Sequence, residues 1–213
     1  MKRGTLRILL NAAITVMVFT VWILSFFLWQ KGTLSANGWD NLRFFTVESN
    51  LLVGVVALVW LVCRLCGKQD AKWLSVVKYV STAAVFVTFT VVILFLGPLY
   101  GFGMMYAGSN LYFHLIVPLL SIAEYVFFER GRVSFRETFF AIAPPAVYGV
   151  GYVLNCIVNG IGEWPNRNDW YSFLEWGYGV GVLVFIVICA VAWGLGLSLR
   201  ALQGAAMKER RKE

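Results

Sequence analysis

The stretch Arg43-Phe-Phe-Thr-Val-Glu-Ser-Asn-Leu-Leu52 opens an apolar run that continues to Cys66. A run of this length is enough to cross a bilayer as one helix. Its first turns carry polar side chains, which are costly in hydrocarbon unless other groups pair with them. Thr46, Ser49 and Asn50 are spaced to share one face of the predicted helix. The stretch therefore predicts polar partners on neighbouring helices.

The composition indicates a membrane protein along the whole chain. Hydrophobic residues make up 60% of the 213 residues and charged residues only 14%, whereas soluble domains carry about 25% charged residues. The mean hydropathy is +0.74. We expect an all-α, polytopic membrane protein with six transmembrane helices in one bundle, forming a single domain over 1–213. The predicted spans are about 8–29, 44–66, 74–97, 110–128, 138–159 and 176–199.

Lysine and arginine are distributed unequally between the two sets of loops. Of the 18 basic residues, only Lys31, Arg43 and Arg167 fall on one side of the predicted bundle. Basic residues collect in cytoplasmic loops. The asymmetry predicts that both termini are cytoplasmic and that the loop 160–176 is outside.

Several classes of function are disfavoured by the same residues. The net charge of +7 is dispersed in short clusters at helix ends, which is not the basic patch of a nucleic-acid-binding protein. Cys63-x-x-Cys66 has the spacing of a redox or metal pair, but no second Cys or His pair accompanies it, and helix packing is the favoured interpretation. We expect no cofactor and no metal, and the sequence indicates no oligomeric state.

Polar residues of three predicted helices reach a similar depth below the outer surface. In the second span these are Thr46, Ser49 and Asn50, and in the fourth they are Asn110 and His114. We expect the second, fourth and fifth helices to line one pocket at this level. The fifth span contributes a stripe of Tyr148, Tyr152, Asn155 and Asn159.

His114 and Thr46 are the candidate reactive residues. His114 is the single histidine of the chain, and ionisable groups inside membrane helices are usually functional. A neutral imidazole can act as a general base. A membrane threonine commonly bonds the carbonyl one turn back, but beside a histidine it becomes a candidate nucleophile.

Other motifs favour structural roles. Glu124 is expected to pair with Lys78 or Arg130 rather than to form part of a proton path. Pro118 and Pro144-Pro145 predict kinks in the fourth and fifth helices. The segment Ser134-Phe-Arg-Glu137 has the spacing of a capping box at the start of the fifth helix.

Two short motifs resemble a known family. Phe45-Thr46-x-x-Ser49-Asn50-Leu51 and His114-x-x-x-Pro118-Leu119 are similar to segments of the androgen-induced gene 1 and androgen-dependent TFPI-regulating protein family, and to its small bacterial members above all. Pro145-x-x-Tyr148 and Asp169-Trp-Tyr171-x-Phe-Leu174 add to the resemblance, although Ser172 stands where a proline is expected.

The resemblance implies a membrane-embedded threonine hydrolase. Animal members of the family cleave fatty acid esters of hydroxy fatty acids, and by position Thr46 would be the nucleophile and His114 the base. The partners implied are membrane lipids and a lipid-ester substrate. The implied location is the cell membrane, which is the inner membrane in bacteria.

Three functional hypotheses stay open at this level. In the first, Thr46 attacks a lipid ester and His114 takes its proton. In the second, the same polar level binds a lipid or small molecule without catalysis, for carriage or transport. In the third, the polar stripe only joins helices. Under the first hypothesis, the residues that bind substrate or the oxyanion would come from Ser49, Asn50, Asn110, Tyr152 and Asn155.

Overall fold

A computed structural model describes residues 3–27, 38–68, 71–163, 167–210 and 212. These residues form helices and connecting turns, with no strand among them. They include six helices that are long and apolar enough to cross a membrane, which confirms the predicted all-α bundle of six spans. Residues 28–29, at the predicted end of the first span, and Lys31 lie outside the described residues.

Three of the six spans are built from more than one helical segment. The first two are single helices, α1 (Arg3–Phe27) and α2 (Phe45–Leu65), and α2 follows a short 3-10 helix, η1 (Gly38–Arg43). The last is the long helix α9 (Tyr178–Arg210). The third span comprises α3 (Lys72–Val91), η2 (Val92–Leu96) and α4 (Gly97–Tyr100). The fourth comprises α6 (Ser109–Leu111), η3 (Tyr112–Ile116) and α7 (Val117–Phe128), and the fifth η4 (Arg136–Ile142) and α8 (Ala143–Asn159). Between the third and fourth spans lies α5 (Phe102–Met105).

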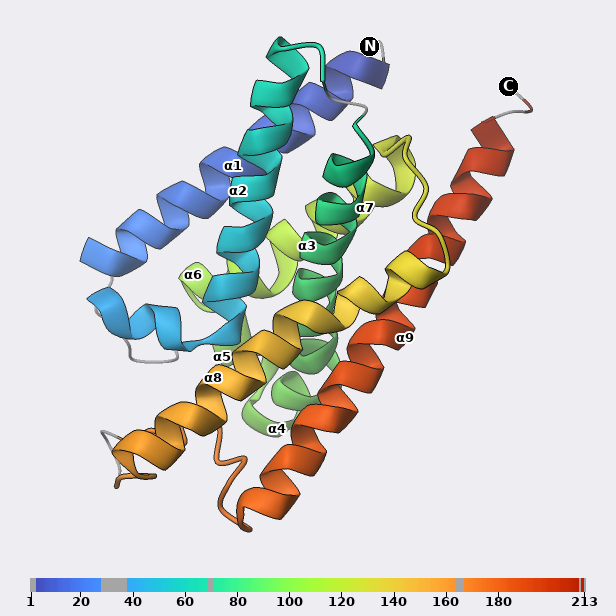
Figure 1. The fold of residues 1–213 in the computed structure, drawn as a ribbon. Coiled ribbons are helices and arrows are strands. Elements are labelled where there is room, and N and C mark those ends of the chain that lie inside the picture. Colours follow the sequence, from blue (N-terminus) through green and yellow to red (C-terminus); the bar gives the residue numbers. More distant parts are fainter. Residues whose placement is uncertain (1–2, 28–37, 69–70, 164–166, 211, 213) are drawn as a thin grey trace.

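Helix α3 lies at the centre of the bundle (Figure 1) and packs against α2, α7 and α9. Its middle is rich in small residues, Ser81, Thr82, Ala83 and Ala84, all buried. Small side chains let neighbouring helices approach closely in a membrane, where hydrophobic burial gives little drive for association. Helix α1 begins and helix α9 ends at the same end of the bundle (Figure 1).

Two buried clusters hold the spans together. Tyr79 and Ala83 of α3 pack with Tyr125 of α7 and Leu199 of α9. Nearer the middle, Val85 of α3 joins residues of α1, α2 and α7 in a second cluster, namely Ile14, Val18, Val53, Ala57 and Val117. Because α3 contributes to both clusters, it fixes the relative positions of the other helices.

Prolines determine two π turns. The N–H of Gly97 bonds the carbonyl of Val92, and the N–H of Val117 bonds that of Tyr112. Each π turn begins six residues before a proline, Pro98 or Pro118. Proline has no N–H and its ring clashes with the carbonyl four residues back, so the preceding turn widens. The disturbance expected at Pro118 therefore takes the form of a π turn, and His114 lies inside it.

The start of the fifth span confirms the predicted capping box. The N–H of Ser134 donates to Glu137 at 2.5 Å, and the N–H of Glu137 donates to the Ser134 hydroxyl at 3.3 Å. These reciprocal bonds satisfy N–H groups that a helix start leaves free. At Pro144-Pro145 the 3-10 helix η4 gives way to α8.

The orientation of the bundle yields a first prediction. In a variant without native cysteines, Glu163→Cys is expected to react with a membrane-impermeant maleimide on intact cells, and Lys208→Cys is not, because lysine and arginine concentrate on the cytoplasmic side. Both residues are exposed. Lysed cells provide the control, since both cysteines should then react. The reverse pattern on intact cells would contradict the orientation.

Candidate functional site

Asn50 connects the second span to the fourth. Its amide nitrogen donates to the carbonyl of Thr46 at 2.7 Å and to the carbonyl of Phe113 at 3.0 Å. The side chain is completely buried, and both of its amide hydrogens are used by these bonds. One nitrogen atom therefore lies between the Thr46 turn of α2 and the π turn that carries His114.

His114 is held by a single hydrogen bond. Its Nδ1 lies 2.7 Å from the carbonyl oxygen of Met105 in α5. A carbonyl only accepts, so Nδ1 carries a proton, and in the neutral imidazole Nε2 carries the lone pair. The ring is 2% exposed, and Nε2 is buried with no hydrogen-bond partner among the residues that the structure describes.

Two amide atoms of the second and fourth spans are also without partners among the described residues. Asn110, one turn before His114, is buried, and no described residue hydrogen-bonds its Nδ2; the same holds for Oδ1 of Asn50. Buried polar atoms are nearly always paired, because an unpaired one costs about 1–3 kcal/mol. The second and fourth spans thus hold an unpaired donor on Asn110 and unpaired acceptors on Asn50 and His114.

The two hydroxyl groups of α2 differ in their bonding. Ser49 donates to the Thr46 carbonyl at 3.1 Å and lies 3.0 Å from the hydroxyl of Thr88 on α3. Thr46 is half-buried, and its hydroxyl makes no hydrogen bond within the described part of the chain. The common bond of a membrane threonine to the carbonyl one turn back is therefore not formed here.

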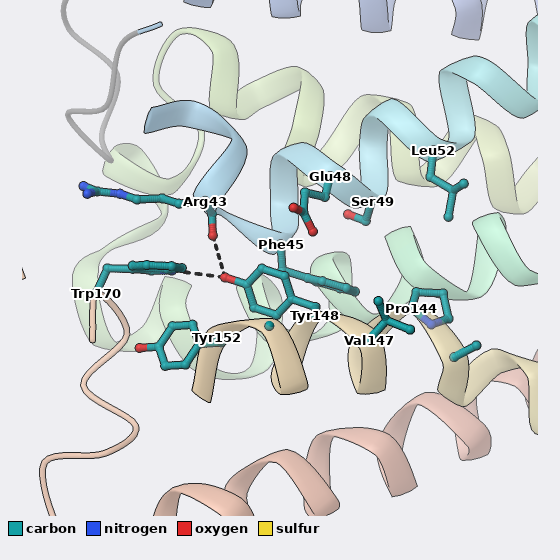
Figure 2. A pocket seen from close by; sticks show the side chains of 12 residues that line it. Arg43, Phe45, Glu48, Ser49, Leu52, Pro144, Val147, Tyr148, Tyr152 and Trp170 are labelled. Atoms are coloured by element: carbon teal, nitrogen blue, oxygen red, sulfur yellow. Dashed lines mark hydrogen bonds between the residues drawn. The ribbon is translucent and has the colours of Figure 1, made fainter. Parts of the chain in front are cut away.

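A cavity of about 480 Å³ lies between α2 and α8. Figure 2 shows that the rings of Phe45 and Tyr148 lie against each other beside it, with centroids 5.3 Å apart. Among the predicted site residues, Ser49 and Tyr152 line this cavity, whereas Thr46, Asn50, Asn110, His114 and Asn155 do not. Its walls also include Glu48, Leu52, Val147 and Gly151.

The two asparagines of α8, Asn155 and Asn159, bond to each other, and neither lines the cavity between α2 and α8. Helix α8 packs mainly against α9, α3, η4 and α2. Asn155 accepts a bond from Asn159 at 2.8 Å on the exposed C-terminal part of the helix. Residue spacing gives depth in the membrane, but it does not give the angular position of a helix around the bundle.

Tyr152 belongs to a separate buried cluster. Its hydroxyl donates to Asp169 at 2.5 Å and accepts from the N–H of Tyr171 at 3.0 Å. Asp169 is completely buried and also accepts from the N–H of Leu174. This arrangement fixes the segment that precedes α9 against α8.

The same segment covers the start of α2. The N–H of Phe45 donates to the hydroxyl of Tyr171 at 3.2 Å, and burial raises the pKa of that hydroxyl to about 12. Tyr148 donates to the carbonyl of Arg43 at 2.6 Å and accepts from the indole of Trp170 at 3.0 Å (Figure 2). Sequence reasoning missed Trp170 and Arg43 as cavity residues, although the Asp169-Trp-Tyr171 motif marked the segment.

A second polar cluster is buried in the other half of the bundle. Glu124 of α7 accepts from Lys78 at 2.6 Å, which confirms the expected pairing, and also from Arg7 and Asn11 at 3.0 Å each. Arg7 pairs in addition with Glu129. Two cations therefore face two carboxylates, which is the condition for holding charges away from water. Arg130 does not take part through its side chain in the described residues.

Comparison of the chain with protein-family models, with curated proteins and with solved structures finds no match in any of the three.

Proposed function

We propose that the protein is a membrane-embedded hydrolase of lipid esters in which Thr46 is the nucleophile and His114 the base. The observation that carries the proposal is the state of His114. Its Nδ1 is fixed by the Met105 carbonyl, and its buried Nε2 is left with a lone pair that no described residue uses. A base oriented by a third group can activate a hydroxyl, and the hydroxyl of Thr46 makes no hydrogen bond among the described residues.

The reaction proceeds in two stages. The Thr46 oxygen attacks the ester carbonyl while His114 Nε2 takes the hydroxyl proton. The tetrahedral intermediate then expels the alcohol, which receives that proton from the imidazolium, and leaves an acyl-threonine. Water, deprotonated by the same imidazole, attacks the acyl group and releases the fatty acid together with the free threonine.

Asn110 is the favoured amide donor to the oxyanion. An oxyanion needs N–H groups directed at it, and both hydrogens of the Asn50 amide are committed to carbonyls. Asn155 lies on α8 and pairs with Asn159. The Nδ2 of Asn110 is buried and has no partner among the described residues, so it is the free donor near the imidazole.

The substrate class is supported by the surroundings. The site lies within membrane spans, where a long-chain ester dissolves and a polar ester does not. Ser49 lines the cavity between α2 and α8, and most of the other side chains in its walls are apolar. An acyl chain therefore fits there. The motif resemblance around Thr46 and His114 supports fatty acid esters of hydroxy fatty acids as substrates.

The experiment is a turnover assay with purified protein in detergent. A fatty acid ester of a hydroxy fatty acid is supplied, and the released fatty acid is measured by mass spectrometry. The proposal predicts release that grows linearly with protein concentration and with time. No release above that of empty micelles, from protein that unfolds cooperatively on heating, would contradict it.

The second candidate function is non-catalytic binding of a lipid or small molecule in the cavity between α2 and α8. The observation that favours it is the size of the cavity, about 480 Å³, which lies within the range of ligand pockets. Under this hypothesis the ester would bind and stay intact.

The variant Gly151→Leu tests occupancy of the cavity. Gly151 lines the cavity, and a Cβ added there meets no atom within 4 Å. The larger side chain is therefore expected to fill the cavity without strain and to weaken ester binding at least tenfold, measured by ligand-induced thermal stabilisation. Gly194→Leu is the matched control, since Gly194 is also helical and a Cβ added there likewise meets no atom within 4 Å. Equal binding by both variants would exclude the cavity as the binding site.

A further inference from the structure

We propose that a second cavity, at the end of the bundle where α1 begins and α9 ends, binds the phosphate group of an anionic lipid. This cavity measures about 240 Å³. Five arginines surround it. Arg3 and Arg7 belong to α1, Arg64 to α2 and Arg210 to α9, and Arg130 follows the end of α7.

Four of the five arginines around this cavity have no carboxylate partner among the described residues. Arg7 is neutralised within the buried cluster of Glu124, Glu129 and Lys78. No carboxylate pairs with the other four arginines within residues 3–27, 38–68, 71–163 and 167–210. Like charges held close together repel, so the arrangement favours binding of an anion.

The cavity opens at the surface and reaches into the bundle. Its floor includes Arg7 and Trp60, which are only 5% and 2% exposed. Arg210 is anchored by a bond of 2.8 Å from its guanidinium to the carbonyl of Val126, while its Nε is buried and makes no hydrogen bond among the described residues. A buried donor without a partner, in a wall of uncompensated cations, points to an acceptor ligand.

The chemistry of the wall fits a phosphate. Guanidinium groups present N–H donors in a planar fork that matches phosphate oxygens. The volume is below that of typical drug-sized pockets but suits a head group. Phe127 and Phe128 form an apolar side of the cavity, and Phe127 is 53% exposed on the surface of the membrane span. In an anionic lipid, the phosphate would contact the arginines and the acyl chains would contact the phenylalanines. Basic pockets between membrane helices are known to bind anionic head groups.

The test measures lipid-dependent stabilisation of the full chain in detergent. Phosphatidic acid and phosphatidylglycerol are expected to raise the melting temperature saturably, and phosphatidylcholine is not. The variant Arg64→Gln/Arg130→Gln should need about 30-fold more anionic lipid for half-saturation, at roughly fivefold per arginine. Both residues are exposed and make no side-chain hydrogen bond in the described chain, so the variant should fold. Native mass spectrometry then counts the lipids retained by each protein.

The control is Arg136→Gln/Lys208→Gln, which removes the same charge from exposed residues at the same end that do not line the cavity. It should bind anionic lipid like the parent. Equal loss in both double variants would show diffuse surface attraction and would overturn the site. Stabilisation by inorganic phosphate or glycerol phosphate at the same concentrations as by lipid would keep a phosphate site but overturn the lipid as its source.

Discussion

Replacement of His114 by alanine is expected to reduce ester hydrolysis by about 10²–10⁴-fold, because the hydroxyl of Thr46 then has no base to take its proton. Thr46→Ala should be at least as damaging, whereas Thr46→Ser should retain part of the activity because a hydroxyl survives. The double variant Thr46→Ala/His114→Ala should be no worse than Thr46→Ala alone, since the two residues act as a unit. The measurement is kcat for release of fatty acid by purified protein.

Two asparagine variants provide the matched comparison. Asn110→Ala is expected to lower kcat by about 10²–10³-fold through loss of a donor to the oxyanion. Asn155→Ala should leave kcat unchanged, because Asn155 pairs with Asn159 on α8. Full activity in Thr46→Ala would refute the nucleophile, and equal losses in the two asparagine variants would refute Asn110 as the specific donor.

Replacement of Glu124 by glutamine is expected to lower the free energy of unfolding by about 3–5 kcal/mol, the largest stability effect we expect. Glu124 is 2% exposed and accepts from both Arg7 and Lys78. Without its charge, these two buried cations face only Glu129, and an uncompensated buried charge is strongly destabilising. The free energy of unfolding is measured by titration with a denaturing detergent.

An exposed ion pair serves as the control for Glu124. Lys72 and Glu137 are 2.7 Å apart, and the Lys72 side chain is 54% exposed. Lys72→Met should therefore cost less than about 1 kcal/mol. Adding Lys78→Met to Glu124→Gln should recover part of the loss, since it removes one uncompensated cation. A smaller loss in Glu124→Gln than in Lys72→Met would contradict the charge balance described for this cluster.

The sequence predicts the spans because its signal for them is local. Runs of apolar residues define the six membrane helices, and the spacing of Ser134 and Glu137 defines the capping box that the structure contains. The pairing of Glu124 with Lys78 follows from matching depth and opposite charge. Each of these inferences depends on residues that are close in the chain, or on the depth of a residue in the membrane.

What could not be predicted depends on the arrangement of helices around the bundle axis. Asn155 is predicted at a depth similar to that of His114, yet α8 packs mainly on α9 and α3, and its two amides bond to each other. Arg7 and Glu129 look like ordinary residues at helix ends, and only the fold brings them to Glu124. The bond between His114 and Met105 needs the turn between two spans, which no periodicity describes.

The position of an active-site adduct tests the proposed chemistry most directly. The purified protein is treated with a long-chain alkyl fluorophosphonate, which phosphonylates activated hydroxyl groups, and the modified residue is identified by peptide mass spectrometry. One adduct is expected, on Thr46, and it should be absent from His114→Ala. An adduct on Ser49 in its place, or labelling of Thr46 that persists in His114→Ala, would contradict the proposed chemistry.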